Sequence, residues 1–216
     1  MILVNSFGGC ATTMLIDQIA KSGGNLVFNG HNGEFKKYKH IINPPSSILS
    51  ENHHSNQSSI TKALYVFSDP IDAIKTFYRR RENGNRGEGK IENWVTGHAK
   101  NIGTRHRVDP SWDIRDYSAK KKDILCLEEH WENWNNSVLD YDVMYVKYEN
   151  MWENLISIQQ FLNLPESFIS NFPAKRKRNH IEIPDDVLLL LSETYSSLVA
   201  KVSNCPDIRI RRKGER

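Results

Sequence analysis

Near the N-terminus, residues 2–21 read ILVNSFGGCATTMLIDQIAK. The apolar run Ile2–Val4 predicts a short strand, and the small residues from Ser6 to Ala11 predict a tight loop. Apolar residues then recur three and four positions apart, which predicts an amphipathic helix over residues 12–21. A strand, a glycine-containing loop and a helix form the place where α/β proteins bind phosphate, because backbone N–H groups and the positive end of the helix dipole face the anion. An ordinary turn of small residues is the alternative interpretation.

Further apolar runs predict strands at residues 26–28, 63–67 and 143–146. After the second of these runs, Asp69 and Pro70 match an N-cap followed by a first helical residue. Another amphipathic helix is predicted for residues 124–134. Strands that alternate with helices indicate a mainly parallel sheet covered on both faces, so we expect a three-layer α/β/α fold.

The C-terminal half is predicted to contain two more helices. Asn150 and Glu153 resemble a capping box that opens a helix ending before Pro165. Pro184 then opens a long helix that reaches Val202. Residues 43–61 are predicted to form a loop, and residues 83–122 an irregular insertion.

The composition indicates one domain spanning residues 1–216. With 38% hydrophobic and 25% charged residues, the chain can build one core, which excludes disordered and collagen-like classes. Cys10, Cys126 and Cys205 are too widely spaced for a disulfide framework or a metal site, so we expect no metal. No apolar run suits a signal peptide or a membrane span, so we expect a soluble, cytoplasmic protein with no membrane partner.

The net charge of +3 conceals an uneven distribution. Residues 79–122 contain twelve Lys and Arg but six Asp and Glu, and further basic clusters lie at residues 175–178 and in a tail at residues 207–216. Any one cluster is accounted for by a solvated face, but several on one domain favour an anionic ligand. The low net charge and the lack of a nucleic-acid-binding module speak against nucleic acid as that ligand.

Two common nucleotide-binding motifs are missing from the N-terminal loop. The loop has no Lys in a Gly-x-x-x-x-Gly-Lys-Ser/Thr frame, which speaks against a nucleoside triphosphatase. Gly-x-Gly-x-x-Gly is also absent, which speaks against a dinucleotide-binding fold.

Three segments, taken in order, resemble sulfotransferases that use 3′-phosphoadenosine-5′-phosphosulfate (PAPS). Residues 9–15 (GCATTML) resemble the family's 5′-phosphosulfate loop, and residues 65–78 (YVFSDPIDAIKTFY) resemble its 3′-phosphate-binding strand and helix. Residues 128–134 and 143–165 resemble its last sheet strand and flanking helices. The resemblance implies a P-loop-like sulfotransferase architecture, with PAPS as co-substrate and a hydroxyl or amine on a small molecule or carbohydrate as acceptor.

The resemblance also implies which residues bind the nucleotide. They comprise the loop, two positions around the second strand–helix unit, and the basic cluster before the last helix: Gly8, Gly9, Cys10, Ala11, Thr12, Thr13, Ser68, Thr76, Lys175, Arg176, Lys177 and Arg178.

His40 is the predicted catalytic base. It lies in Lys39–Pro44, which resembles the family's Lys-x-His segment, and a neutral imidazole is a suitable base near physiological pH. A surface histidine is the alternative interpretation, and His31 and Glu34 are fallback bases in the same region.

The chain departs from the family at two charged positions. The family's loop Lys aligns with Gly9 and its 3′-phosphate Arg with Ser68, whereas Thr76 keeps a hydroxyl where Ser is usual. A non-catalytic nucleotide- or anion-binding protein on the same fold is therefore the alternative function. Compensating cations are predicted in the basic cluster of residues 175–178 and at four lysines: Lys36, Lys37, Lys39 and Lys75.

The acceptor is predicted to bind in the segment 84–122, through its aromatic and basic residues Trp94, Arg105, Arg107 and Trp112. Anchoring of a long loop is the alternative role for these residues. The sequence specifies neither the acceptor nor the oligomeric state.

Overall fold

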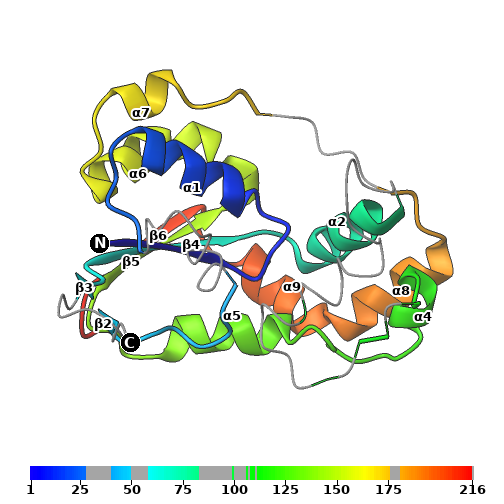
Figure 1. The fold of residues 1–216 in the computed structure, drawn as a ribbon. Coiled ribbons are helices and arrows are strands. Elements are labelled where there is room, and N and C mark those ends of the chain that lie inside the picture. Colours follow the sequence, from blue (N-terminus) through cyan, green and yellow to red (C-terminus); the bar gives the residue numbers. More distant parts are fainter. Residues whose placement is uncertain are drawn as a thin grey trace.

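The computed structural model describes residues 1–27, 40–49, 58–82, 99, 106, 108–109, 111–175 and 181–215. This part of the chain is mixed α/β, around a four-stranded sheet in the order β1-β4-β5-β6 (Figure 1). Strands β1 (Ile2–Ser6), β4 (Lys62–Phe67) and β5 (Asp142–Lys147) are parallel, and β6 (Ile208–Arg211) is antiparallel to β5. The sheet is thus mainly parallel, and the strands predicted near its centre are confirmed.

Helices lie on both faces of the sheet. On one face are α1 (Thr12–Lys21), α6 (Leu155–Leu162) and α7 (Ser167–Ser170), and on the other are α5 (Leu127–Asn136) and α9 (Ser196–Ser203) (Figure 1). Beyond the carboxyl ends of the strands lie α2 (Pro70–Glu82), α4 (Ile114–Ser118) and α8 (Asp185–Thr194). None of the described helices is both long and apolar enough to cross a bilayer.

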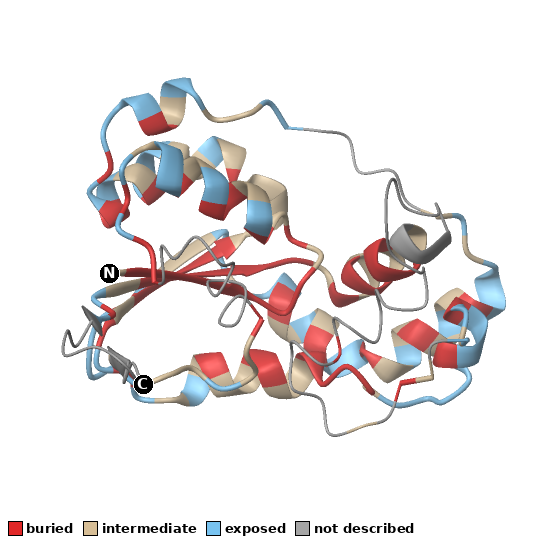
Figure 2. Ribbon diagram, in the orientation of Figure 1, coloured by how far each residue is buried: buried red, intermediate tan, exposed pale blue. Residues whose placement is uncertain are grey.

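The core forms because the central strands are buried on both faces, as expected when helices cover a parallel sheet. Every residue of β1 is buried, and so are Ala63–Phe67 of β4 (Figure 2). Tyr65 packs against Trp134 of α5 and Tyr145 of β5, and its hydroxyl lies 2.9 Å from Nδ1 of His130. This aromatic cluster joins α5 to the sheet.

The strand register brings three chain segments to one edge of the sheet. Ser6 pairs with Val66, and Phe67 pairs with Lys147, so β1, β4 and β5 end side by side. The junction after β4 forms as predicted: Asp69 Oδ1 accepts hydrogen bonds from the amides of Ile71 (2.8 Å) and Asp72 (3.1 Å), and α2 begins at Pro70. Loops that meet at the carboxyl edge of parallel strands are where such folds bind ligands.

The basic tail predicted at residues 207–216 contains the edge strand β6, which the sequence analysis missed. Arg211 is buried, donates a hydrogen bond to the carbonyl oxygen of Trp134 (2.8 Å), and lies over the ring of Tyr145. The charged guanidinium can be buried because carbonyl oxygens accept its hydrogen bonds and an aromatic ring packs against it. A strand in which isoleucine and arginine alternate therefore completes the sheet.

The long helix predicted after Pro184 is interrupted at Tyr195, between α8 and α9. The Tyr195 hydroxyl donates to Asp123 Oδ1 (3.0 Å) and is hydrogen-bonded to the hydroxyl of Tyr117. This side chain is held by a segment far away in sequence, and periodicity carries no information about such a contact.

Other local predictions were wrong or only partly correct. Two 3₁₀ turns, η2 (Tyr148–Asn150) and η3 (Trp152–Asn154), stand where a capping box was predicted, and α6 begins only at Leu155. Helix α4 lies within the predicted irregular insertion and has its own capping box, formed by Asp113 and Asp116.

Two predictions near the N-terminus also need correction. The predicted strand 26–28 is represented by a single parallel bridge between Ile2 and Leu26, and residue 28 lies outside the described residues. The predicted loop 43–61 contains the short strands β2 (Ile48–Leu49) and β3 (Ser58–Ser59).

Candidate functional site

The loop between β1 and α1 is compact and depends on glycine. Gly9 has a φ of 72°, and a Cβ atom built there would lie 3.1 Å from Cα of Ala73 in α2. Ser6 Oγ accepts a hydrogen bond from the amide of Gly8 (3.1 Å) and lies 2.6 Å from the hydroxyl of Thr12. The loop is thereby held between the end of β1 and the first turn of α2.

The N-terminus of α1 lacks the usual side-chain cap. Its N-cap residue is Ala11, which has a left-handed backbone (φ 54°, ψ 25°) and no side-chain oxygen, and the first turn contains no acidic residue. The first amides of a helix have no partner within the helix and carry partial positive charge. This end of α1 is therefore suited to an anion.

His40 lies beside this loop and is almost buried, with 8% of its surface exposed. Its Nδ1 atom is 2.8 Å from the carbonyl oxygen of Ser6 and 3.2 Å from Ser6 Oγ. A carbonyl oxygen only accepts hydrogen bonds, so Nδ1 carries the proton of the neutral ring and Nε2 carries the lone pair. The hydrogen bond to Ser6 thus sets the tautomer in which Nε2 can act as a base.

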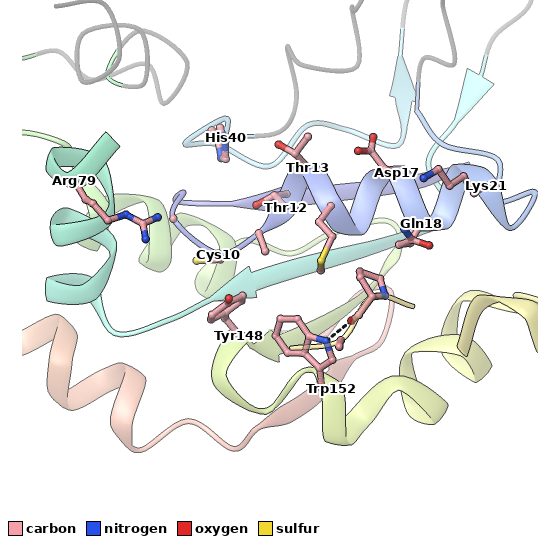
Figure 3. Close-up of a pocket in the computed structure, with 15 residues that line it drawn as sticks. Cys10, Thr12, Thr13, Asp17, Gln18, Lys21, His40, Arg79, Tyr148 and Trp152 are labelled. Carbon is pink, nitrogen blue, oxygen red and sulfur yellow. Dashed lines mark hydrogen bonds between the residues drawn. The ribbon is translucent and has the colours of Figure 1, made fainter. Parts of the chain in front are cut away.

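The loop and His40 line one cavity of about 500 Å³ (Figure 3). The loop and α1 form one wall, His40 and Arg79 lie at the end near the loop, and residues after β5 form the opposite wall. The lining residues are Gly9–Met14, Asp17, Gln18, Lys21, His40, Arg79, Tyr148, Trp152, Pro173 and Ala174.

The wall opposite α1 is aromatic. The rings of Tyr148 and Trp152 meet edge to face with centroids 5.4 Å apart, and Trp152 Nε1 donates to the carbonyl oxygen of Pro173 (2.8 Å). The indole is therefore held in place by packing and by a hydrogen bond. The cavity combines a polar, anion-attracting wall with a flat aromatic one, which suits a ligand that contains both a ring and a charged group.

The structure brings together most of the predicted loop site and the predicted base. Residues Gly9 to Thr13 and His40 line the same cavity, and Gly8 lies in the same loop, where its amide donates a hydrogen bond to Ser6 Oγ. Lys175 lies next to the aromatic wall, with Nζ 5.8 Å from the ring centroid of Trp152 and 3.4 Å from Glu153 Oε1.

Ser68 and Thr76 do not line the cavity. Ser68 is completely buried and accepts a hydrogen bond from Cys10 Sγ (3.3 Å). The hydroxyl of Thr76 donates to the carbonyl oxygen of Asp72 one turn earlier in α2 (2.9 Å). Both hydroxyls are engaged within the protein, and their role in nucleotide binding stays a prediction.

Several predicted residues lie outside the described part of the chain: Arg176, Lys177, Arg178, His31, Glu34, Lys36, Lys37, Lys39, Trp94, Arg105 and Arg107. Of the remaining candidates, Lys75 pairs with Asp72 (3.9 Å). Trp112 carries Lys120 over its ring at 4.4 Å, so its face is covered by the protein's own cation. Within the described ranges, no group of three or more His, Cys, Asp or Glu residues could hold a metal ion.

Sequence reasoning missed nine of the fifteen residues that line the cavity, and the three with charged or aromatic side chains outside α1 are Arg79, Tyr148 and Trp152. Only Arg79 had a usable signal, because it follows Thr76 by three positions on a predicted helix and so lies on nearly the same side of it. Tyr148 and Trp152 follow β5, and their proximity to α1 depends on the strand order.

No family model, curated protein or solved structure matches this chain. Its function is therefore argued from the cavity itself.

Proposed function

We propose that this protein is a sulfotransferase, which moves a sulfuryl group from PAPS to a hydroxyl or amine of a small molecule or carbohydrate. The observation that carries the proposal is the shared cavity: the glycine loop at the start of α1 and the basic atom of His40 belong to one site. The succession of β1, the glycine loop and α1 supports the proposal, because such a junction is where α/β proteins bind phosphate groups.

The cavity is suited to the donor nucleotide. Its volume of about 500 Å³ lies within the range of small-molecule sites, which is roughly 300–1,000 Å³. The 5′-phosphosulfate would bind at the amides of the loop and α1, beside Thr12 and Thr13, where the helix dipole favours negative charge. The adenine ring would pack on the aromatic wall of Tyr148 and Trp152.

In the proposed reaction, the bond between sulfur and the oxygen of the 5′-phosphate breaks while sulfur bonds to the acceptor oxygen or nitrogen. Nε2 of His40 takes the proton from the acceptor, and adenosine 3′,5′-bisphosphate leaves with the bonding electron pair on its phosphate oxygen. Positioning of the two substrates and stabilisation of the departing anion supply most of the rate enhancement in such a transfer.

The direct test is transfer of radiolabelled sulfate from PAPS to a panel of hydroxyl and amine acceptors. In an active preparation, His40→Ala should lower the transfer rate by about 10²–10⁴-fold, the usual contribution of a general base. His106→Ala is the matched control, because His106 is a half-buried histidine that does not line the cavity. An unchanged rate in His40→Ala would remove His40 as the base.

A second candidate function is nucleotide or anion binding without catalysis. The observation that favours it is the tight packing at Gly9, which aligns with the family's loop Lys. A Cβ atom at this position would lie only 3.1 Å from Cα of Ala73, so the loop has no room for a lysine side chain. Calorimetry with adenosine 3′,5′-bisphosphate separates the possibilities. Binding without transfer to any acceptor supports the second function, and no binding at millimolar concentration rejects the sulfotransferase proposal.

A further inference from the structure

A second cavity, of about 390 Å³, lies on the face of the sheet that carries α5 and α9, opposite to α1 (Figure 1). One side of α5, the end of α9 with the turn that follows it, and β6 form its walls. The lining residues are Trp131, Glu132, Asn135, Asn136, Lys201, Asn204, Cys205, Pro206 and Arg209. This cavity shares no lining residue with the one at the glycine loop.

Arg209 gives the second cavity a positive charge that no described carboxylate balances. Its guanidinium lies 4.2 Å from the ring centroid of Tyr145, and Nη2 donates to Oδ1 of Asn135, which is a neutral amide. Among the described residues, no carboxylate forms an ion pair with Arg209, and its buried Nε atom has no hydrogen-bond partner. Arg211 lies two positions further along β6, on the same face of the strand, and its charge adds to that of Arg209.

Negative charge is in excess nearby, where α5 meets α9. Nζ of Lys201 lies 2.7 Å from Oε1 of Glu128 and 2.5 Å from Oε1 of Glu132, so one ammonium group is shared by two carboxylates. Glu128 has a further donor in the hydroxyl of Ser197 (2.6 Å) and does not line the cavity. Glu132 does line it, and among the described residues only Lys201 donates to its carboxylate. Glu132 therefore presents a carboxylate whose charge is only partly balanced.

These two unbalanced charges belong to neighbouring turns of one helix face. Glu132 and Asn135 are three positions apart on α5, which places their Cβ atoms roughly 5–6 Å apart, and Arg209 is bonded to Asn135. Arg209 would attract a ligand that carries only a carboxylate, but Glu132 would repel it, and the reverse holds for a ligand that carries only an ammonium group. A small molecule with both groups satisfies both side chains. Trp131 adds apolar surface for its carbon chain.

We propose that the second cavity binds an amino acid in its zwitterionic form, with the carboxylate on Arg209 and the ammonium group on Glu132. The cavity volume lies within the range of small-molecule sites, which is roughly 300–1,000 Å³. Because the site is separate from the cavity at the glycine loop, its occupancy does not depend on the proposed function.

Cys205 lines the second cavity and serves as a local probe of binding. Cys10 and Cys126 are buried, so N-ethylmaleimide should react first at Cys205, and mass spectrometry identifies the modified residue. The ligands are glycine, β-alanine and γ-aminobutyrate, with butyrate as the acid without an amine and butylamine as the amine without an acid. At least one amino acid should slow the labelling of wild type at millimolar concentration. Butyrate and butylamine should bind about 10-fold more weakly, because each lacks one charged hydrogen bond.

Two variants test the assigned residues. Arg209→Gln and Glu132→Gln should each weaken binding of the amino acid by about 10-fold, the effect of one lost charged hydrogen bond. Arg212→Gln is the matched control, because Arg212 is exposed, pairs with Asp142 (2.8 Å) and does not line the cavity. Burial raises the pKa of the Cys205 thiol and the charge of Arg209 lowers it, so the labelling of each variant is compared with and without ligand.

Three results would overturn the proposal. The first is that none of the three amino acids protects Cys205 in wild type, and the second is that butyrate protects it as well as they do, since the ammonium group would then not be recognised. The third is an equal loss of binding in Arg212→Gln, which would make net charge rather than the cavity responsible. Should Arg209→Gln not fold, Glu132→Gln still decides, because unchanged binding in that variant also contradicts the assignment.

Discussion

Helices α1 and α5 begin with the same backbone geometry but are completed differently. Each follows an N-cap residue in the left-handed region, Ala11 (φ 54°) before α1 and Cys126 (φ 53°) before α5, and neither N-cap side chain makes a capping hydrogen bond. Non-glycine residues adopt this conformation at a cost of about 1–2 kcal/mol, so it must be imposed by its surroundings.

At α5 the protein supplies its own anion. Oδ2 of Asp123 accepts a hydrogen bond from the amide of Glu128 (2.8 Å), and its other oxygen accepts from Tyr195. At α1 the first turn has no acidic residue, and the same end of the helix lines the 500 Å³ cavity. One helix start is therefore closed by an internal carboxylate, whereas the other faces a cavity.

Disruption of the open end should have the largest effect. Gly9→Ala introduces a Cβ in a left-handed residue 3.1 Å from Cα of Ala73, and we expect a loss of about 3 kcal/mol of unfolding free energy from strain and overpacking. Affinity for adenosine 3′,5′-bisphosphate should fall by more than about 100-fold, because the loop must move. Urea unfolding and calorimetry measure the two effects.

Gly23→Ala is the control for this change. Gly23 also has a positive φ (79°), but a Cβ there meets nothing within 4 Å, so only the backbone strain of about 1 kcal/mol should appear. Equal losses in the two variants would show that the contact between the loop and α2 is unimportant.

Removal of the internal anion should have the next largest effect. Asp123→Ala leaves the amide of Glu128 and the hydroxyl of Tyr195 without their acceptor, which should cost about 2 kcal/mol of unfolding free energy. Nucleotide affinity should stay unchanged, because Asp123 does not line the cavity. A parallel loss of nucleotide affinity would show that the start of α5 affects binding at the start of α1, which contradicts this expectation.

The cost of Asp123→Ala should also depend on pH. Burial raises the pKa of the Asp123 carboxyl, and the carboxylate of Glu128 adds to this, although hydrogen bonds from the amides of Glu128 and Leu127 and from Tyr195 act against it. Because the pKa in the folded state is higher than in the unfolded state, the stabilisation is complete below about pH 3.8 and decreases as pH rises through the folded value. The difference in unfolding free energy between wild type and variant should therefore shrink from pH 4 towards neutrality. A difference that grows with pH would contradict a raised pKa of Asp123.

The smallest effect is expected from the hydroxyl pair that supports the loop. Thr12→Val removes one of the hydrogen-bond partners of Ser6 Oγ from a buried site and should cost about 1 kcal/mol. Thr13→Val alters an exposed residue and should change stability by less than about 0.5 kcal/mol. Thermal unfolding of both variants tests this, and similar melting temperatures would show that Thr12 does not hold the loop.

The site was only partly predictable because some of its residues, like some of the missed helices and strands, are placed by contacts between segments that are far apart in the sequence. The loop, Asp69 with α2, and the strands around residues 64 and 144 are local, because glycine, caps and apolar periodicity act over a few residues. Placement of His40 beside Ser6, and of Tyr148 and Trp152 opposite α1, joins segments more than thirty residues apart. Sequence spacing contains no measure of such distances.

The amino-acid pattern alone determined the α/β class, the glycine loop at the start of α1 and the residue types that make it suitable for an anion. The folded chain decided the rest: Tyr195 divides a continuous helical pattern, Arg211 draws the basic C-terminal segment into the sheet, and Arg79 of α2 lines the same cavity as the loop. Each of these depends on a side chain whose partners come from distant strands and helices. Packing in three dimensions, and not local preference, selects those partners.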